Sequence, residues 1–368
     1  MSMQFTLDYN CPHTKARLGT LSTSHSVIET PVFMPVGTQG TVKTLISDDL
    51  KTLGYPIMLS NSYHLYLRPG CEIVKAAGGL HRFMNWQGSI LTDSGGFQMV
   101  SLKEMCKIER DGVRFQSHID GSSHFIGPRE CMRIQRDLGA DIVMAFDECA
   151  PYPASEEYTL KAVENTTRWT RIAREEPLDA HQSLFAIVQG GVYPHLREKS
   201  AKELVELDFP GYAIGGLSVG EAKPLMYEMV EATVPFLPEN KPRYLMGVGT
   251  PEDLLEAVER GIDMFDCVMP TRIARNGTLY SAKGLVVLKQ AQYENDFNPP
   301  DQSCSCFVCQ NYSRAYLRHL LKAREISGLR LNTYHNLHFI KQLMRNIRLA
   351  IKNNDFPAFK KQFLAEYF

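Results

Sequence analysis

The chain has 368 residues, enough for one large domain with an attached subdomain. Its 44% hydrophobic and 22% charged residues are typical of a globular protein, and its net charge of −1 argues against nucleic-acid binding by the whole surface. No apolar run approaches the roughly 18 residues of a membrane span, and the N-terminus lacks the features of a signal peptide. We therefore expect a cytoplasmic protein with no membrane association.

Short apolar segments recur along the chain, and each ends on a polar residue or a glycine. There are eight: Pro31–Gly37, Pro56–Asn61, Gly88–Asp93, Ala140–Asp147, Ser183–Gly190, Gly211–Gly216, Pro242–Gly249 and Gly261–Asp266. Their length and apolar character are typical of buried parallel strands.

Segments with helical periodicity lie between several of these strands: Ser155–Glu176, Leu196–Leu207, Lys223–Thr233 and Pro251–Arg260. Thr250 is a good N-cap, because a proline and two acids follow it. Eight alternating units predict a (β/α)8 TIM barrel. The alternative is a doubly wound sheet, but its G-x-G-x-x-G motif is absent, since Gly247-Val248-Gly249 does not extend to it.

In a barrel the carboxyl ends of all strands meet at one face, where catalysis takes place. The residues at those ends are Asn61, Asp93, Asp147, Gln189, Gly215, Gly216, Met246 and Asp266. Three carboxylates and two amides predict a site for a polar, hydrogen-bonding ligand.

The segment from Gly261 to Gly277 is the most informative of these. A carboxylate at the end of a buried strand, here Asp266, is costly to ionise unless a polar or reactive group meets it. Arg272 and Arg275 follow within ten residues and suggest an anionic ligand. The alternative reading is a structural aspartate that caps the next segment.

The other strand ends could bind a flat, nitrogen-rich ring. Asp147 could accept two N–H donors of a purine edge, while Gln189 and the backbone N–H of Gly216 serve its carbonyl side. Phe97 and Met246 are the apolar candidates to sandwich the ring, although either alone is more often a core residue.

Three cysteines near the C-terminus have metal-ligand spacing: Cys304, Cys306 and Cys309. Three thiols and one histidine form a closed tetrahedral set that is typical of structural Zn²⁺. The histidines that could complete it are His319, His335 and His338, and we favour His335.

Basic residues dominate between Gln310 and Lys352, where Glu325 is the only acid. They are Arg314, Arg318, Lys322, Arg324, Arg330, Lys341, Arg345, Arg348 and Lys352. Such a stretch is either a solvated helix face or a phosphate-binding surface.

Seven motifs together resemble the tRNA-guanine transglycosylases almost from end to end. They are TDSGGFQ (Thr92–Gln98), FDEC (Phe146–Cys149), VQGG (Val188–Gly191), GGLSVGE (Gly215–Glu221), FDCVMPTR (Phe265–Arg272), RNG (Arg275–Gly277) and the C-x-C-x2-C…H module. Members of that family are (β/α)8 barrels that exchange a guanine in tRNA for a 7-deazaguanine base. The resemblance implies a homodimer that binds the tRNA anticodon arm.

The resemblance also implies roles for individual residues. Asp266 is the nucleophile and Asp93 the general acid and base. The other implied sets are base recognition by Asp147, Gln189, Gly216 and Leu217, stacking by Phe97 and Met246, tRNA phosphate contacts from Arg272 and Arg275, and structural Zn²⁺ at Cys304, Cys306, Cys309 and His335.

Two positions resemble the bacterial members of the family. Val219 stands where relatives that use the larger base queuine need glycine, and Cys149 indicates the same subtype. The implied substrate is then 7-aminomethyl-7-deazaguanine, used in queuosine biosynthesis. Phe97 stands where many relatives carry tyrosine, so a hydroxyl is missing there.

We expect a catalytic barrel with an N-terminal extension over residues 1–290 and a zinc-binding, basic helical subdomain over 291–350. A helix over 351–368 would pack back on the barrel. Two other functions remain compatible with the sequence. A retaining glycoside hydrolase would share the barrel and paired carboxylates without needing the zinc module, and a non-catalytic tRNA-binding subunit would not need both Asp93 and Asp266.

Overall fold

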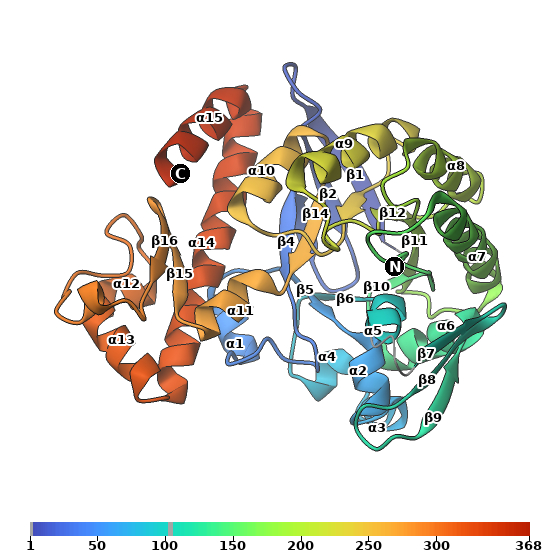
Figure 1. Cartoon of the computed structure of the whole chain (residues 1–368), viewed down its shortest axis with the longest axis horizontal. Coiled ribbons are helices and arrows are strands. Elements are labelled where there is room, and N and C mark those ends of the chain that lie inside the picture. Colours follow the sequence, from blue (N-terminus) through green and yellow to red (C-terminus); the bar gives the residue numbers. More distant parts are fainter. Residues whose placement is uncertain (1–2, 102–105) are drawn as a thin grey trace.

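A computed structural model of the chain describes residues 3–101 and 106–368. Its centre is a barrel of eight parallel strands (Figure 1): β4 (Val32–Pro35), β5 (Ile57–Ser60), β6 (Ser89–Thr92), β10 (Ile142–Met144), β11 (Ser183–Val188), β12 (Gly211–Ile214), β13 (Arg243–Leu245) and β14 (Met264–Cys267). A parallel bridge between Val36 and Leu59 joins the two ends of the sheet. Seven of the expected apolar segments contain one strand each, and the eighth, Gly261–Asp266, ends one residue before β14 does. The predicted (β/α)8 barrel is confirmed.

The strands are apolar on both faces because both faces are buried. In β14 the side chain of Met264 belongs to the cluster that fills the barrel, and that of Phe265 to the larger core between strands and helices. Both are fully buried. This alternation is the packing expected of a filled barrel rather than a pore.

Helices follow the strands in the expected alternation. Those of the first half are α1 (Ser47–Thr52), α2 (Ser62–Leu67), α3 (Cys71–Ala76), α4 (Leu80–Phe83), α5 (Gly96–Ser101) and α6 (Pro128–Leu138). Those of the second half are α7 (Glu156–Glu175), α8 (Pro194–Val205), α9 (Lys223–Thr233), α10 (Pro251–Glu259) and α11 (Met269–Arg275). Thr250 caps α10 as predicted, since its side chain accepts a hydrogen bond from the backbone N–H of Asp253.

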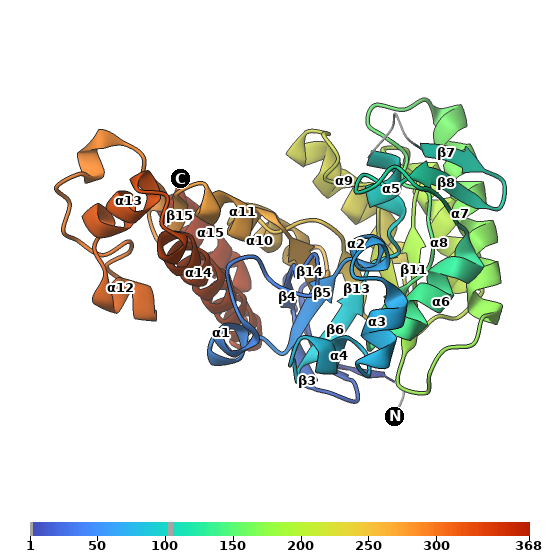
Figure 2. The same cartoon turned by 90° about the horizontal axis from the view of Figure 1, so that it is seen from below.

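The barrel helix that packs against β4 comes from the far end of the chain. It is α14 (Ile326–Lys352), which also contacts α10 and α11. Between α11 and α14 the chain forms β15 (Thr278–Ser281), β16 (Gly284–Val287), α12 (Phe307–Asn311) and α13 (Arg314–Lys322), a module that stands on the side of α14 away from the barrel (Figure 2). No helix among the described residues, α14 included, is long and apolar enough to cross a bilayer.

The last helix, α15 (Phe356–Tyr367), folds back along α14. Lys360 on α15 forms ion pairs of 2.6 Å with Glu256 and Glu259 on α10. The end of the described chain is therefore held against a barrel helix.

Two small antiparallel sheets accompany the barrel. One, β7 (Cys106–Glu109), β8 (Gly112–Gln116) and β9 (Ser123–Ile126), lies between α5 and α6. The other, β1 (Gln4–Asn10), β2 (Arg17–Ser22) and β3 (Val27–Thr30), covers the amino-terminal end of the barrel, where Leu21 and Ile28 join the interior cluster. Such a cover keeps water out of the open end of the barrel core.

A buried ion pair joins this N-terminal sheet to the barrel. Arg17 on β2 donates two hydrogen bonds of 2.9 and 2.5 Å to Asp263, and neither side chain is more than 2% exposed. Two further donors of Arg17 reach the carbonyls of Glu239 and Lys241. The pair is fully satisfied, so it can be buried without leaving an uncompensated charge.

Arg17→Ala should lower the free energy of unfolding by about 3–5 kcal/mol, because it leaves the Asp263 carboxylate buried without its ion-pair partner. The matched control is Arg330→Ala, which breaks a 2.8 Å pair with Asp49 whose arginine is 51% exposed. That change should cost about 0–1 kcal/mol. Urea denaturation of both variants measures the difference, and equal losses would contradict this account of the pair.

Candidate active site

The three carboxylates expected at the barrel mouth lie there. Asp93 follows β6, Asp147 lies beyond β10, and Asp266 is part of β14. Because these strands are parallel, their carboxyl ends share one face. The charge of Asp266 contributes to raising the pKa of Asp93, as expected for two acids that face one another across the mouth.

Asp93 is surrounded by hydrogen-bond donors. Its carboxylate accepts bonds from the side chain of Asn61 (2.5 Å), the backbone N–H of Ser62 (2.8 Å) and the side chain of Gln98 (2.7 Å). Burial raises the pKa of Asp93 to about 6 against the opposing effect of these bonds. A carboxyl group with this pKa can gain and lose a proton near neutral pH.

The described residues hold Asp266 through one of its two oxygens. Its Oδ1 accepts hydrogen bonds from the hydroxyl of Tyr244 (2.5 Å) and the backbone N–H of Gly247 (2.8 Å). Within residues 3–101 and 106–368, Oδ2 takes part in no hydrogen bond. Burial raises the pKa of Asp266, and the two donors oppose that shift. One oxygen is thus fixed while the other is left for a ligand.

Tyr244 was missed in the sequence, where it reads as one more apolar residue of the segment Pro242–Gly249. It is fully buried within the barrel interior, yet its hydroxyl reaches the mouth. The only sequence signal was an aromatic side chain with a polar tip beside a strand end, and that signal is weak.

Asp147 and Gln189 form a hydrogen-bonded pair. The side-chain amide of Gln189 donates to Oδ2 of Asp147 (2.6 Å), and the hydroxyl of Ser94 donates to Oδ1 (2.7 Å). Burial raises the pKa of Asp147. Gly96 closes over this group, since a methyl group there would lie 2.5 Å from the backbone oxygen of Asp147. The pair is oriented and has little room around it.

Gly216 gives Gln189 its space. A methyl group at Gly216 would lie 2.4 Å from Oε1 of Gln189, and its φ of +66° suits glycine. The guanidinium of Arg197, fully buried on α8, donates to the carbonyl of Gly215 (3.2 Å) and to that of Gly216 (3.3 Å). Sequence reasoning also missed Arg197, because an arginine in a helix usually lies on the surface.

The remaining base-binding candidates differ in exposure. Leu217 is buried beside Gly216, and Met246 is partly buried against the barrel interior. Phe97, at the start of α5, is 52% exposed. An aromatic side chain left this free in solvent is available to a flat ligand, and its stacking with Met246 remains a prediction.

Arg272 and Arg275 lie on α11, directly after the strand that carries Asp266. Arg272 is exposed. Arg275 is half-buried, and its Nη1 has no hydrogen-bond partner among the residues that the structure describes. Burial lowers the pKa of Arg275, and the charge of Arg272 adds to that effect. Two neighbouring cations without an acid partner in the described chain are suited to bind an anion.

Part of the basic stretch between Gln310 and Lys352 forms ion pairs within the protein. Ion pairs to acids are formed by Arg314, Arg318, Arg330 and Arg348. The positive charge left for a ligand is therefore smaller than the sequence suggested. More of it comes from exposed residues such as Lys322, at the end of α13, and Arg324, between α13 and α14.

The cysteine cluster is completed by His335. The ligand atoms of Cys304, Cys306, Cys309 and His335 all lie within 4.8 Å of one another. The Nε2–H of His335 donates to the carbonyl of Tyr280 (2.7 Å), so Nδ1 presents its lone pair to the thiols of Cys306 and Cys309 at 3.5 and 3.3 Å. This donor set fits a tetrahedral metal ion.

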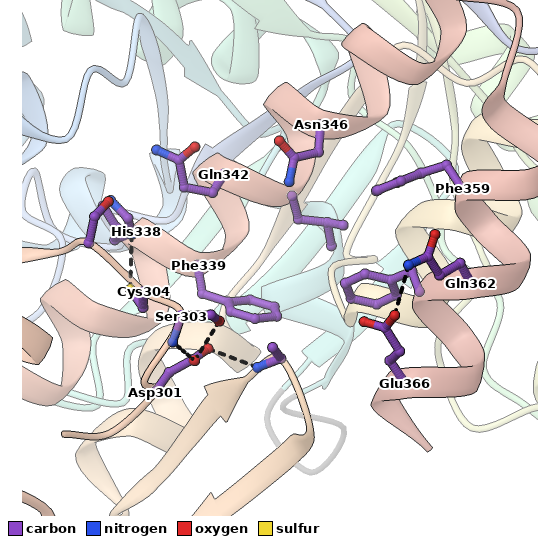
Figure 3. A pocket seen from close by; sticks show the side chains of 14 residues that line it. Asp301, Ser303, Cys304, His338, Phe339, Gln342, Asn346, Phe359, Gln362 and Glu366 are labelled. Atoms are coloured by element: carbon purple, nitrogen blue, oxygen red, sulfur yellow. Dashed lines mark hydrogen bonds between the residues drawn. The ribbon is translucent and has the colours of Figure 1, made fainter. Parts of the chain in front are cut away.

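His338 touches the cluster only at its edge, with Nδ1 3.5 Å from the sulfur of Cys304. Both residues line a cavity of about 400 Å³ between the module, α14 and α15 (Figure 3). Phe339, Phe359 and Phe363 supply its apolar wall. Cys304 is consequently the most accessible ligand of the set.

A family model described as queuine tRNA-ribosyltransferase matches residues 11–368. The chain belongs to this family. It is 59% identical to the queuine tRNA-ribosyltransferase of Pelotomaculum thermopropionicum over 100% of this chain and 99% of the relative. It is 57% identical to that of Desulforamulus reducens, over 99% of this chain and 98% of the relative. It is 55% identical to that of Lysinibacillus sphaericus, over 100% of this chain and 96% of the relative. The resemblance seen in the motifs is confirmed.

The raised pKa of Asp93 predicts a specific dependence of stability on pH. Between pH 3.8 and about 6 the unfolded chain releases the Asp93 proton and the folded protein keeps it, so rising pH destabilises the fold in that window. A shift of this size corresponds to about 3 kcal/mol. Asp93→Asn has no carboxyl group at this position, so it does not lose this stability as the pH rises. Its free energy of unfolding relative to wild type should therefore rise by about 2 kcal/mol from pH 4 to pH 7, because part of the loss has already taken place at pH 4.

Denaturant titrations of both proteins at the two pH values measure this difference. The amide of Asp93→Asn presents N–H groups to the donors around it, which lowers the free energy of unfolding by the same amount at both pH values. This cost therefore cancels in the comparison. A difference that does not change with pH would contradict the raised pKa.

Proposed function

We propose that this protein is a tRNA-guanine transglycosylase that replaces the wobble guanine of GUN-anticodon tRNAs with 7-aminomethyl-7-deazaguanine. The reaction needs a nucleophile, a proton carrier and a pocket that binds two related bases in turn. The observation that carries the proposal is the pairing of two acids at one barrel mouth: Asp266, with one oxygen that bonds to no described residue, and Asp93, with a pKa of about 6. The family match supports the same activity.

In the first half-reaction Oδ2 of Asp266 attacks the anomeric carbon of the flipped-out nucleoside. The bond from that carbon to the guanine nitrogen breaks, and its electron pair leaves with the base, which takes a proton from Asp93 or from a water that Asp93 orders. The sugar then forms an ester with Asp266, as in retaining glycosidases. Tyr244 and Gly247 hold Oδ1 and so aim Oδ2.

In the second half-reaction the incoming base loses its ring N–H proton to Asp93 and attacks the same carbon. The ester bond breaks and its electrons return to the carboxylate of Asp266. Two inversions retain the configuration of the sugar. A single group serves as acid and then as base, which is most effective when its pKa is near the working pH.

Both bases present the same hydrogen-bonding edge, so one recognition set can serve them. Asp147 accepts from the ring N–H and amino groups, and Gln189, Gly216 and Leu217 bind the carbonyl side. Phe97 and Met246 close over the faces of the ring. Val219 and Cys149 favour the aminomethyl base over queuine.

Outside the pocket, Arg272 and Arg275 contact the phosphates that flank the target, and basic residues of the C-terminal helices hold the anticodon arm. The metal is a structural Zn²⁺, bound by Cys304, Cys306, Cys309 and His335. We also propose a cytoplasmic homodimer, on the family resemblance. The direct test of function is exchange of radiolabelled guanine into an unmodified GUN-anticodon tRNA, and no incorporation would reject the proposal.

Asp266→Asn should abolish exchange and prevent a denaturation-resistant enzyme–tRNA adduct, because an amide cannot displace guanine. Tyr244→Phe is the graded comparison. It removes one hydrogen bond to a charged group and should lower kcat by about tenfold to a hundredfold while adduct still forms. Gel electrophoresis under denaturing conditions and steady-state exchange measure both effects. Normal turnover in Asp266→Asn would exclude this mechanism.

Cys306→Ser should lose the metal and destabilise the module around it, because metal binding supplies folding energy there. Elemental analysis is expected to find about one zinc per chain in the wild type and none in this variant. The control is Cys71→Ser, which changes a partly exposed thiol on α3, outside the cluster. Loss of zinc from the control alone, or a metal-free and equally stable wild type, would refute the assignment.

Arg275→Ala should raise the KM for tRNA and flatten its salt dependence, because it removes a phosphate contact. The KM for the free deazaguanine should barely change. Asp147→Ala should do the reverse and weaken base binding by about 1–3 kcal/mol. Arg171→Ala, an exposed arginine on α7, controls for general loss of positive charge. If Arg275→Ala weakened the free base as much as the tRNA, its placement at the phosphates would be wrong.

A further inference from the structure

Arg197 is a buried cation beside the base-recognition residues, and the reaction described above gives it no role. It lies on α8, and its side chain is fully buried. Its Nε donates to the carbonyl of Gly191 (2.7 Å). Its Nη1 and Nη2 donate to the carbonyl of Gly215 (3.3 and 3.2 Å), and Nη2 also donates to that of Gly216 (3.3 Å). All of these acceptors are neutral backbone oxygens.

The positive charge of Arg197 is not neutralised by an ion pair within the described chain. Burial lowers the pKa of Arg197 to about 10, so the side chain still carries its charge at neutral pH. The charge of Glu221 opposes this shift, but its carboxylate accepts hydrogen bonds from the backbone N–H groups of Ser218 and Val219 (2.5 and 3.0 Å). A buried charge without a partner of opposite sign destabilises a protein. An anion that enters the mouth beside Arg197 lowers this cost.

The guanidinium acts on the mouth through one peptide unit. The carbonyl of Gly215 and the N–H of Gly216 belong to the same peptide, and two nitrogens of Arg197 donate to that carbonyl. Hydrogen bonds to an amide oxygen polarise the peptide, so its N–H becomes a stronger donor. This N–H bonds to the sulfur of Cys149, where it opposes the rise in pKa that burial causes. It therefore faces the strand end that carries Asp147, and a ligand carbonyl is a better acceptor than the thiol.

Both half-reactions of the proposed exchange place negative charge on the base. When the bond from the anomeric carbon to guanine breaks, its electron pair stays on the ring nitrogen, and conjugation shares this charge with the carbonyl oxygen of the base. The incoming deazaguanine carries the same charge once it has lost its N–H proton to Asp93. A preorganised donor aimed at charge that develops during a reaction lowers the barrier more than it tightens binding of the neutral ligand.

We propose that Arg197 is a positioning residue that stabilises the anionic base in both half-reactions. It holds the peptide between Gly215 and Gly216 and places a positive charge behind the carbonyl side of the pocket. Its Nη2 lies 3.9 Å from the place that a methyl group would occupy at Gly216. Arg197 keeps its own protons and acts through the peptide, not by contact with the base. The inference rests on the proposed function.

This role predicts a selectivity that a purely structural arginine does not have. A charge behind the pocket favours an ionised base over a neutral one of the same shape, and buried surroundings of low dielectric strengthen the effect. An arginine that only shaped the loop after β12 would favour neither. The two roles can therefore be separated by comparing ligands that differ in charge alone.

The test compares guanine with 8-azaguanine, which has the same recognition edge and a nitrogen in place of the C8–H group. At mildly alkaline pH guanine is neutral, whereas the triazole ring of 8-azaguanine has lost its proton. Equilibrium dialysis of the full-length protein with each radiolabelled base, without tRNA, gives the ratio of the two affinities. Arg197→Met keeps the length of the side chain and removes its charge. It should lower the affinity for 8-azaguanine relative to guanine by about tenfold.

Arg197→Gln separates charge from hydrogen bonding and carries less risk to folding. Its amide can still donate to a backbone carbonyl but is neutral, so the ratio should fall as in Arg197→Met. Both variants should lower kcat for guanine exchange by about tenfold or more and change the KM for tRNA little. Arg171→Met is the matched control, because Arg171 is exposed on α7. It should keep the affinity ratio and the kcat of the wild type.

An affinity ratio in Arg197→Gln equal to that of the wild type would overturn the inference, whether both bases bind as before or both are weakened to the same extent. Such a result in a wild type that exchanges guanine would leave the proposed function intact. A wild type that binds neither base and exchanges no guanine would instead reject the proposed function, and the role of Arg197 with it. The two failures are therefore distinguishable.

Discussion

Burial of carboxylates at the ends of parallel strands is the constraint on which the mouth of this barrel depends. Each acid loses hydration there, and burial raises the pKa of Asp93, Asp147 and Asp266 alike. What distinguishes them is the set of donors that replaces water. Among the residues that the structure describes, Asp93 accepts from three donors, Asp147 is bonded through both oxygens, and Asp266 is bonded through Oδ1 alone. Three chemically identical side chains can thus take three roles.

The positions of the metal cluster and of α11 both depend on α14. His335 on this helix belongs to the metal cluster, and its neighbour Asn336 donates to the carbonyls of Pro270 and Thr278 (3.0 and 3.1 Å). One turn earlier, Asn332 donates to the carbonyl of Ala274 (3.3 Å). All three side chains are fully buried. The metal cluster and α11, which follows the strand of Asp266, are consequently held by one face of one helix.

The parts of this structure that could be predicted are those that depend on residues close together in the sequence. The eight strands followed from short apolar segments, the start of α10 from Thr250, and the metal cluster from cysteine spacing. The same reasoning could not find Tyr244 or Arg197, because a buried tyrosine resembles core and a helical arginine resembles surface until their partners are known. The roles assigned to the mouth residues came from the family resemblance, and they remain predictions.

The position of α14 also bears on how the protein is made. Strand β4 emerges early from the ribosome, but the strand that pairs with it, β14, and the helix that covers it, α14, are among the last segments to follow. At about 5–20 residues per second, one edge of this apolar strand must wait for tens of seconds for its partner. During that time β4 can contact the N-terminal sheet and β5, but the edge that pairs with β14 stays open. A fold closed by its two ends in this way gives chaperones a longer interval in which to bind than one assembled in chain order.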